Sequence, residues 1–340
     1  MIEFFADYGL FLLKTATVVA AIVMIIGVAA AAGRKASKAE SIEIENLNER
    51  FSNIAAAVKQ AVFTKSDFKA DIKALKEKAK ALRKARTRRP RTFVIDFKCD
   101  LKAIAVPSQR EVVSAILEVA GEQDNVYMRL DNSGGVVHEH GLAASQLARI
   151  RERNIPLTVA VDKVAASGGY LMACVADRIV AAPFAILGSI GVLAQLPNFN
   201  RLLDNHGVDF EQITAGEYKR NVTMFGKNTD EDRARLKEQL EDVHELFKAA
   251  VTRYRPDLDL AKVATGEYWY GTRALELGLA DELATSDEQL AAMVGERDLY
   301  RISYKVKQPL QKRLMGAADA ALENFDAARW RRRFESRLPR

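Results

Sequence analysis

Cysteine is scarce in this chain. The two that are present, Cys99 and Cys174, each fall inside an apolar strand or helix pattern. Such a pair indicates neither a disulfide framework nor a thiolate metal site. The cysteine content therefore gives no support to a disulfide-stapled secreted scaffold, and it leaves the cellular compartment open.

Histidine is also scarce, with four in the chain, which limits the candidates for the base of a serine–histidine hydrolase. His138 and His140 lack the spacing of a metal-binding His-Glu-x-x-His helix. We interpret them as structural or rim histidines, with a place along a cleft as the alternative. His206 lies in a polar turn and His244 in a charged helix, so the sequence marks neither as a base.

Positive charge is concentrated rather than spread. The net charge is +6, and the segment 65–91 alone holds twelve Lys or Arg against three acidic residues. A local excess of this kind favours a basic face on anionic lipid, or a solvated charged face, over a nucleic-acid-binding surface. We expect no nucleic-acid partner.

The N-terminal region carries a long apolar run. Residues 10–32 follow a short tail, 1–9, and are apolar apart from Lys14 and two threonines. The uncharged part, 15–32, has eighteen residues, which just reaches the length of a membrane span. The acidic start differs from a secretory signal peptide, so we predict a retained transmembrane anchor. Basic residues follow it and favour a cytoplasmic position for the rest of the chain: Arg34, Lys35 and Lys38.

A basic helical spacer is predicted over residues 33–91. Helical spacing of apolar positions runs through 41–89, from Ile44 and Leu47 onward, and a second helix opens at Ser66 before Pro90 ends the pattern. At the other end of the chain, residues 306–340 are predicted to form a basic helix that docks a partner, lies on a membrane surface or is simply exposed.

Strands and helices alternate through the central region, 92–305. We predict strands at 92–97, 126–130, 157–161, 178–182, 185–187 and 210–214, and helices at 108–120, 142–151 and 229–254. Ser108 and Glu111 have the spacing of a capping box. This alternation predicts an α/β fold with a largely parallel sheet and flanking helices.

One stretch at a strand-to-helix junction has the residues that a nucleophile needs. Ser167 follows a buried strand and precedes Gly168 and Gly169. Backbone N–H groups at such a junction favour developing negative charge, and glycines let a substrate carbonyl approach the backbone. The alternative is a helix N-cap serine followed by packing glycines.

A lysine with a lowered pKa is the other base that a serine can use. Lys219 follows a predicted strand and a glycine turn, although a surface position is the default for any one lysine of a lysine-rich chain.

These residues together resemble the signal peptide peptidase A family of membrane-anchored serine peptidases, most closely its SohB-type members. Ser167 matches the family's nucleophile, and Lys219, which lies 52 residues later, matches its general base. Ser189 matches the serine that orients this lysine. The family's oxyanion turn, Asn-Ser-Pro-Gly-Gly, corresponds to residues 131–135, which lack the proline. The resemblance implies that the N–H groups of Gly135 and Gly168 bind the oxyanion, at about 3 kcal/mol per donor. The segment 266–281 also matches, in an architectural role shared with crotonases.

The resemblance implies a ClpP/crotonase-like fold and a Ser/Lys endopeptidase that cleaves short, extended, small or hydrophobic segments such as signal-peptide remnants. It implies no metal or cofactor, a homo-oligomer, and a single N-terminal span in the bacterial inner membrane, with the side of the catalytic domain left open. Two rivals remain: a crotonase-type acyl-CoA enzyme, and a catalytically silent membrane scaffold whose basic segments bind partners or lipid.

Overall fold

The structure is a computed structural model that describes residues 9–22, 24, 40–84, 89–99, 105–216, 219 and 222–306. Two compact units are present: residues 1–42 with 304–340, and residues 43–303. In the first unit the described residues 9–22 and 24 are helical. Among described residues, no helix has the length and apolarity that crossing a membrane requires. Part of the predicted anchor and residues 307–340 of the predicted C-terminal helix lie outside the described residues.

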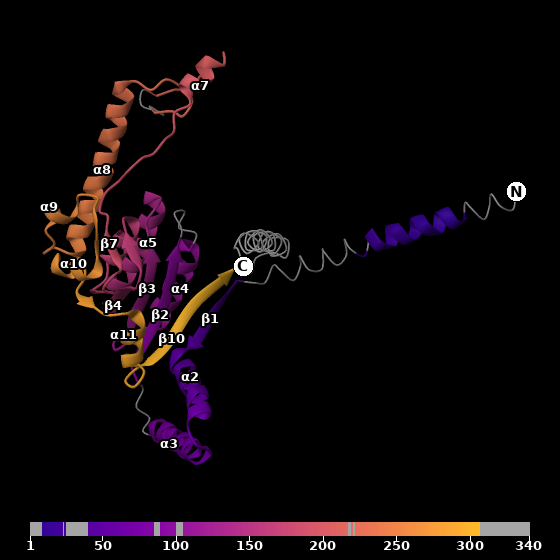
Figure 1. The fold of residues 1–340 in the computed structure, drawn as a ribbon, viewed down its shortest axis with the longest axis vertical. Helices are drawn as coiled ribbons and strands as arrows, with labels where there is room; N and C mark the ends of the chain where they lie inside the picture. The colour runs from indigo at the N-terminus through magenta and orange to yellow at the C-terminus, as the bar shows by residue number, and fades with distance from the viewer. Residues whose placement is uncertain are drawn as a thin grey trace, which may run out of the picture. The chain divides into compact units, whose positions relative to one another are not determined.

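A mostly parallel sheet forms the centre of the second unit (Figure 1). Its strand order is β1-β10-β2-β3-β4-β6-β9, and β3 also leads into a short branch, β5-β7-β8. The described pairs of strands are parallel except β7 with β8. The strands are β1 Glu40–Asn46, β2 Arg91–Cys99, β3 Asn125–Asn132, β4 Leu157–Val161, β5 Val164–Ala166, β6 Arg178–Ala181, β7 Ile186–Gly188, β8 Tyr268–Tyr270, β9 Glu282–Leu283 and β10 Asp298–Val306.

Helices connect these strands, as the alternation in the sequence predicts. α4 packs on α5, and α5 packs on α6. The helices are α2 Leu47–Val62, α3 Lys65–Lys84, α4 Val106–Val119, α5 Val137–Glu152, α6 Gly168–Ala173, α7 Asn200–Asn205, α8 Asp230–Tyr254, α9 Leu260–Val263, α10 Gly271–Glu276 and α11 Ser286–Met293. The prediction of a mixed α/β fold with a mostly parallel sheet is confirmed. The predicted capping box at Ser108 is wrong, because α4 already begins at Val106 and has a proline in its first turn.

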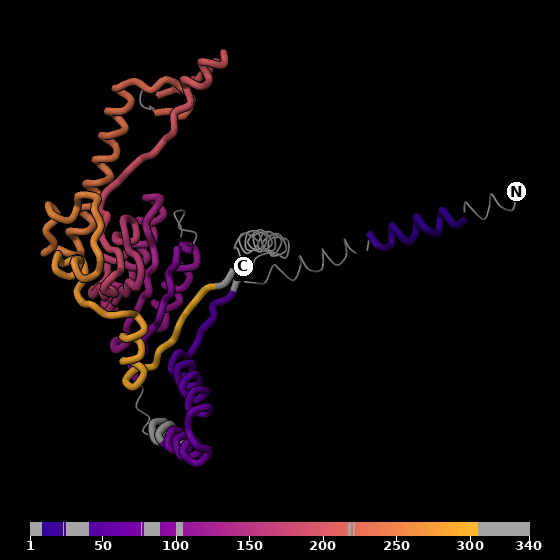
Figure 2. Tube along the Cα trace, in the orientation of Figure 1, coloured from indigo at the N-terminus to yellow at the C-terminus, as the bar shows by residue number. Residues whose placement is uncertain are grey.

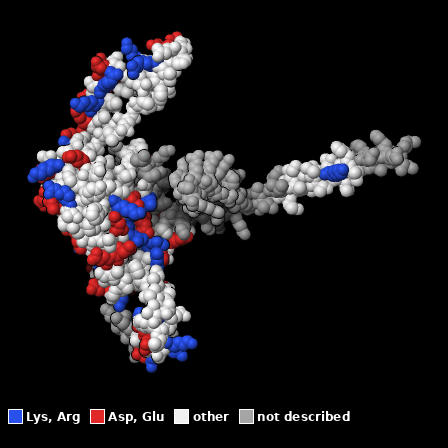
Figure 3. Space-filling model, in the orientation of Figure 1, with Lys and Arg blue, Asp and Glu red and all other residues white. Residues whose placement is uncertain are grey.

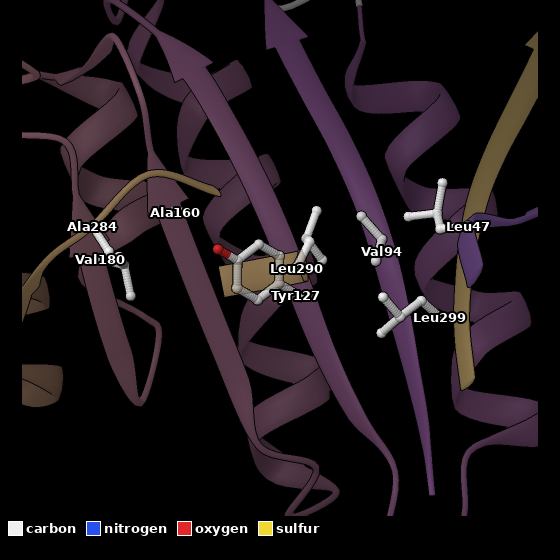
Figure 4. Close-up of a cluster of buried hydrophobic side chains, with 8 residues drawn as sticks. All are labelled: Leu47, Val94, Tyr127, Ala160, Val180, Ala284, Leu290 and Leu299. Carbon is white, nitrogen blue, oxygen red and sulfur yellow. The ribbon is translucent and has the colours of Figure 1, made fainter. Parts of the chain in front are cut away.

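One hydrophobic cluster extends across the sheet on the side that α11 covers (Figure 4). Strands β2, β3, β4 and β6 each contribute one side chain, and Leu290 of α11 packs over them. Burying each of the larger side chains in this cluster contributes about 1.5–3 kcal/mol to the stability of the fold. The cluster consists of Leu47, Val94, Tyr127, Ala160, Val180, Ala284, Leu290 and Leu299.

The segment before β2 is attached to this core. Residues 40–46 form a strand rather than the predicted helix, because Ile42 and Ile44 alternate with polar residues at the strand period of two. Asn46 then caps α2 by accepting a hydrogen bond from the Glu49 N–H. Asn48 bonds to the backbone of the β10 region, so the start of α2 is fixed to the strand that ends the described chain.

Residues 190–229 leave the sheet and return to it through α8, and we call this segment the arm (Figure 2). Cross-connections hold its two limbs together. The Phe199 N–H bonds to the Met224 carbonyl at 2.7 Å, and the ring of Phe225 packs against those of Phe199 and Phe210 at 6.1 and 5.8 Å between centroids. The strand predicted at 210–214 is wrong: none of the described strands pairs with this stretch, and Ile213 is 95% exposed.

The arm and α8 expose different kinds of side chain. Along α8, acidic and basic residues alternate and pair at i,i+3, as between Arg233 and Asp230 (Figure 3). The arm instead exposes apolar side chains, including Leu193 at 74% and Ile213 at 95%. Large apolar side chains left in water are characteristic of a surface that another molecule covers.

Candidate active site

Ser167 lies in a strained turn between β5 and α6. Its φ and ψ are 52° and −121°, a backbone conformation that non-glycine residues rarely adopt. The turn is fixed by the Ser167 N–H, which bonds to the Gly188 carbonyl at 2.8 Å. The side chain makes no capping hydrogen bond. The N-cap interpretation of Ser167 therefore loses its main support, and the hydroxyl is available for chemistry.

A glycine turn packs directly against this serine. Gly134 has φ of 87°, and a Cβ atom placed there would lie 2.7 Å from the Ser167 Cβ and 2.9 Å from the Gly168 nitrogen. Only glycine allows so close an approach. The next residue, Gly135, is exposed, while Gly168 is buried at the start of α6. The structure thus brings together the predicted nucleophile and the two residues predicted to supply oxyanion donors.

Ser189 occupies a matching position on the neighbouring strand. Ala166 of β5 pairs in register with Gly188 of β7, so Ser167 and Ser189 each follow one member of this pair. Ser189 has φ of 51°, and its N–H bonds to the Glu267 carbonyl at 2.6 Å. Two serines with nearly equal positive φ thus leave adjacent parallel strands side by side.

Lys219 is not brought to these residues within the chain. It is exposed in the segment between α7 and α8, where its N–H bonds to the Gly216 carbonyl at 3.3 Å. That segment lies at the end of α8 remote from the sheet (Figure 1). Asn198 holds the segment in place by bonding to the carbonyls of Thr223 and Gly226.

Two polar side chains lie behind the glycine turn. The Oδ1 atom of Asn132 accepts the Gly134 N–H at 2.7 Å, and it also lies 3.1 Å from Nε2 of His140. Both side chains are buried, at about 1% exposure each. The sequence-based interpretation of His140 as a structural or rim residue did not foresee its contact with Asn132, although both residues lie near the predicted oxyanion turn.

Cys174 is the other nucleophilic side chain near α6. Burial raises the pKa of its thiol to about 12. The thiol therefore stays protonated and unreactive. Among the described residues, no group of three or more His, Cys, Asp or Glu side chains is arranged to hold a metal ion.

An open cavity of about 210 Å³, lined mostly by charged residues, lies at the carboxyl ends of β2 and β3, and Ser167 does not line it. Four of its charged side chains pair with one another. Arg129 contacts both carboxylate oxygens of Asp96, and Lys98 lies 3.6 Å from Asp131. The turn at Ser167, not this cavity, is therefore the candidate active site.

Comparison with known proteins shows which family the chain belongs to. "Peptidase family S49 N-terminal" matches residues 3–147, and "Peptidase family S49" matches residues 149–299. A relative from Haemophilus influenzae, named probable protease SohB, is 41% identical over 95% of this chain and 95% of its own. Two relatives of the same name come from Buchnera aphidicola. The one from subspecies Acyrthosiphon pisum is 53% identical over 65% of this chain and 66% of its own, and the one from subspecies Schlechtendalia chinensis is 43% identical over 84% and 98%.

Among solved structures, the 1510-N membrane-bound stomatin-specific protease, in complex with a substrate peptide, matches 68% of this chain and 99% of its own. Its sequence identity is 12% and its TM-score 0.37. The Haemophilus influenzae relative, matched over 95% of both chains, decides the assignment together with the two family matches: the chain belongs to peptidase family S49 and is a protease of the SohB type.

Proposed function

We propose that the chain is a membrane-anchored serine endopeptidase whose nucleophile is Ser167 and whose general base is Lys219. The observation that carries the proposal is the strained Ser167 turn, with φ of 52°, packed against a turn that only glycine can form. Strain of this kind persists where the surrounding structure enforces it, and it concentrates at active sites.

The chemistry follows from the residues in the turn. Ser167 Oγ attacks the peptide carbonyl carbon while its proton passes to the neutral amine of Lys219. The N–H groups of Gly135 and Gly168 bind the oxyanion that forms. Collapse of the tetrahedral intermediate breaks the C–N bond, and Lys219 returns the proton to the departing amine. Water, deprotonated by the same lysine, then hydrolyses the acyl ester and restores the Ser167 hydroxyl.

Ser189 is assigned to orient Lys219. It leaves the sheet beside Ser167, from the strand paired in register with β5. A lysine amine that reaches Ser167 also comes within reach of the Ser189 hydroxyl. The hydrogen bond between them fixes the direction of the amine lone pair.

For this chemistry the arm has to bring Lys219 next to a nucleophilic serine. We propose that this serine is Ser167 of a second copy of the chain. The support for this assignment is the exposed apolar surface of the arm, on which Ile213 is 95% and Leu193 74% exposed. Packing against another copy would remove these side chains from water, at about 25 cal/mol per Å² of apolar surface. The active enzyme is then a homo-oligomer in which each copy supplies its base to a neighbour.

The proposed substrates are short, extended, hydrophobic peptide segments such as signal-peptide remnants. The stretch 10–32 is proposed as the single span that holds the enzyme in the bacterial inner membrane. We also propose that the fold is of the ClpP/crotonase-like type. A parallel sheet with paired backbone N–H donors suits acyl chemistry of this kind.

The experiment uses the full-length chain in detergent and a quenched fluorescent peptide with a hydrophobic core. Ser167→Ala and Lys219→Ala should each abolish turnover, whereas Ser145→Ala, a surface serine of α5, should leave it unchanged. Mixing and reassembling the two inactive variants should restore activity, because mixed oligomers pair an intact Ser167 with an intact Lys219 from different copies. A mixture that stays inactive would contradict delivery between copies, and turnover by Ser167→Ala would contradict the nucleophile.

A further inference from the structure

His140 is a buried polar side chain that the proposed chemistry does not use. It lies in the first turn of α5 and is 1% exposed. A buried imidazole needs hydrogen-bond partners. Both ring nitrogens face oxygen atoms: Nδ1 lies 2.9 Å from the Val136 carbonyl, and Nε2 lies 3.1 Å from Oδ1 of Asn132.

The direction of the second contact is fixed by the glycine turn. The Gly134 N–H is a donor and lies 2.7 Å from the same Asn132 atom, so that atom is the amide oxygen and not the amide nitrogen. A hydrogen bond between the two side chains therefore requires the tautomer with its proton on Nε2 of His140, in which Nδ1 donates nothing to the Val136 carbonyl. The amide nitrogen of Asn132 has a partner of its own, because Nδ2 donates to the sulfur of Met172 at 3.6 Å.

The same imidazole also forms one wall beside Gly168. A Cβ atom at Gly168 would lie 2.5 Å from Cγ and 2.7 Å from Cδ2 of His140. The ring therefore packs against the backbone of Gly168, and through Asn132 it holds the turn that carries Gly135. These are the two residues proposed to bind the oxyanion.

From this arrangement we infer that His140 is a positioning residue that sets the distance between the N–H groups of Gly135 and Gly168. The inference rests on the proposed function. His140 transfers no proton and does not touch the substrate. It acts through Asn132 on one donor and by packing on the other. Misplacing catalytic groups by about 1 Å costs about a hundredfold in rate, so a loosened oxyanion site lowers turnover more than it lowers substrate binding.

The test compares three variants of the full-length protein. His140→Phe keeps a ring beside Gly168 but removes the donor to Asn132. His140→Gln restores one N–H donor. His138→Phe places the same ring at an exposed position on the same helix as a matched control. A fluorophosphonate ester first counts the reactive serines in each preparation, and kcat per reactive serine and KM are then measured on one peptide ester.

We expect His140→Phe to lower kcat per reactive serine about tenfold to a hundredfold, with KM changed less than about threefold. His140→Gln should recover most of this loss, and His138→Phe should match the parent. A merely structural histidine would lower the number of reactive serines and the melting temperature but leave kcat per site unchanged. That result would overturn the inference while leaving Ser167 as the nucleophile. If instead the parent's Ser167 never reacts, the proposed function fails.

A measurement on the parent protein covers the case in which His140→Phe does not fold. Nitrogen-15 spectra of histidine-labelled protein, assigned with His140→Gln, report whether Nε2 of His140 carries a proton. A protonated Nε2 supports the contact with Asn132. An unprotonated Nε2 removes the hydrogen bond on which the inference depends and overturns it.

Discussion

Replacing Gly134 by alanine perturbs the candidate site at its tightest contact. The new Cβ would lie 2.7 Å from the Ser167 Cβ, 2.8 Å from the Ala166 carbonyl oxygen and 2.9 Å from the Gly168 nitrogen. Two of these three neighbours are backbone atoms, which cannot rotate away. The turn must therefore move away from Ser167.

The expected cost has two parts. An alanine at φ of 87° costs about 1–2 kcal/mol relative to glycine, because its Cβ crowds the following carbonyl. Relief of the overlap through backbone shifts adds about 1–3 kcal/mol. The free energy of unfolding should fall by about 2–5 kcal/mol in total. Turnover per folded molecule should fall by about a hundredfold or more, because the Gly135 N–H moves with the turn.

Gly278→Ala is the matched control. Gly278 also has a positive φ, 78°, but an added Cβ would meet only a side-chain methyl of Leu258 at 3.5 Å, an ordinary contact. It should lose about 1–2 kcal/mol of stability and no activity per folded molecule. Chemical denaturation and peptide-ester turnover are measured for both variants. Equal effects of the two substitutions on stability and rate would refute the close approach of the glycine turn to Ser167.

Three further predictions concern the base, its orientation and a structural ion pair. Lys219→Arg should be as inactive as Lys219→Ala in a peptide-ester assay, because a guanidinium stays protonated and cannot accept the serine proton. Substantial activity of Lys219→Arg would mean that Lys219 is only an electrostatic partner. Ser189→Ala should lower kcat about tenfold to a thousandfold, less than loss of Ser167, and an unchanged pH–rate profile would make Ser189 an ordinary loop residue. Asp124 is buried, which raises its pKa, but hydrogen bonds from Arg91 and Gly121 outweigh burial and leave the pKa below its ordinary value. The contact with Arg91 therefore makes its full contribution to stability at pH values above the pKa of Asp124 in the unfolded chain, which is about 3.9. This contribution is lost as the pH falls through the lower pKa of Asp124 in the folded protein. Asp124→Asn should cost about 2–3 kcal/mol at pH 7 and less at pH 2 in denaturant titrations, whereas equal losses at both pH values would contradict the assignment.

Elements with strong local patterns were predictable from the sequence. The strand over 157–161 appears with the predicted bounds, and the helix predicted over 229–254 is α8, with Thr229 capping it through a reciprocal hydrogen-bond pair with Asp232. In both cases the local signal and the tertiary environment agree. An apolar run with β-branched residues becomes a buried strand, and a capping box begins a long helix.

Two errors have a common cause, which is competition between local pattern and pairing partners. Residues 40–46 carry both a helical and an alternating pattern, and the alternating one prevails because β10 offers an edge to pair with. Residues 210–214 have a strand-like composition but lie in the arm, away from any strand edge. Neither outcome can be decided from the local sequence, because the partner is contributed by a distant part of the chain.

The candidate site was predictable where its chemistry depends on residue type. Ser167 and the glycines around it were identified from the sequence, and their juxtaposition is what the structure adds. The contact between His140 and Asn132 was not predictable, because it depends on how α5 leaves the turn. The remote position of Lys219 also depends on the path of the arm, which no local pattern encodes.

The central claim is that Ser167 is the nucleophile, activated by Lys219. The most direct measurement treats the full-length chain with a fluorophosphonate ester and locates the adduct by mass spectrometry of its peptides. We predict one adduct per chain, on Ser167, formed at least about a hundredfold more slowly in Lys219→Ala. Ser145, the exposed serine of α5, should stay unlabelled. Labelling at another serine, or labelling of Ser167 at the same rate without Lys219, would contradict the account.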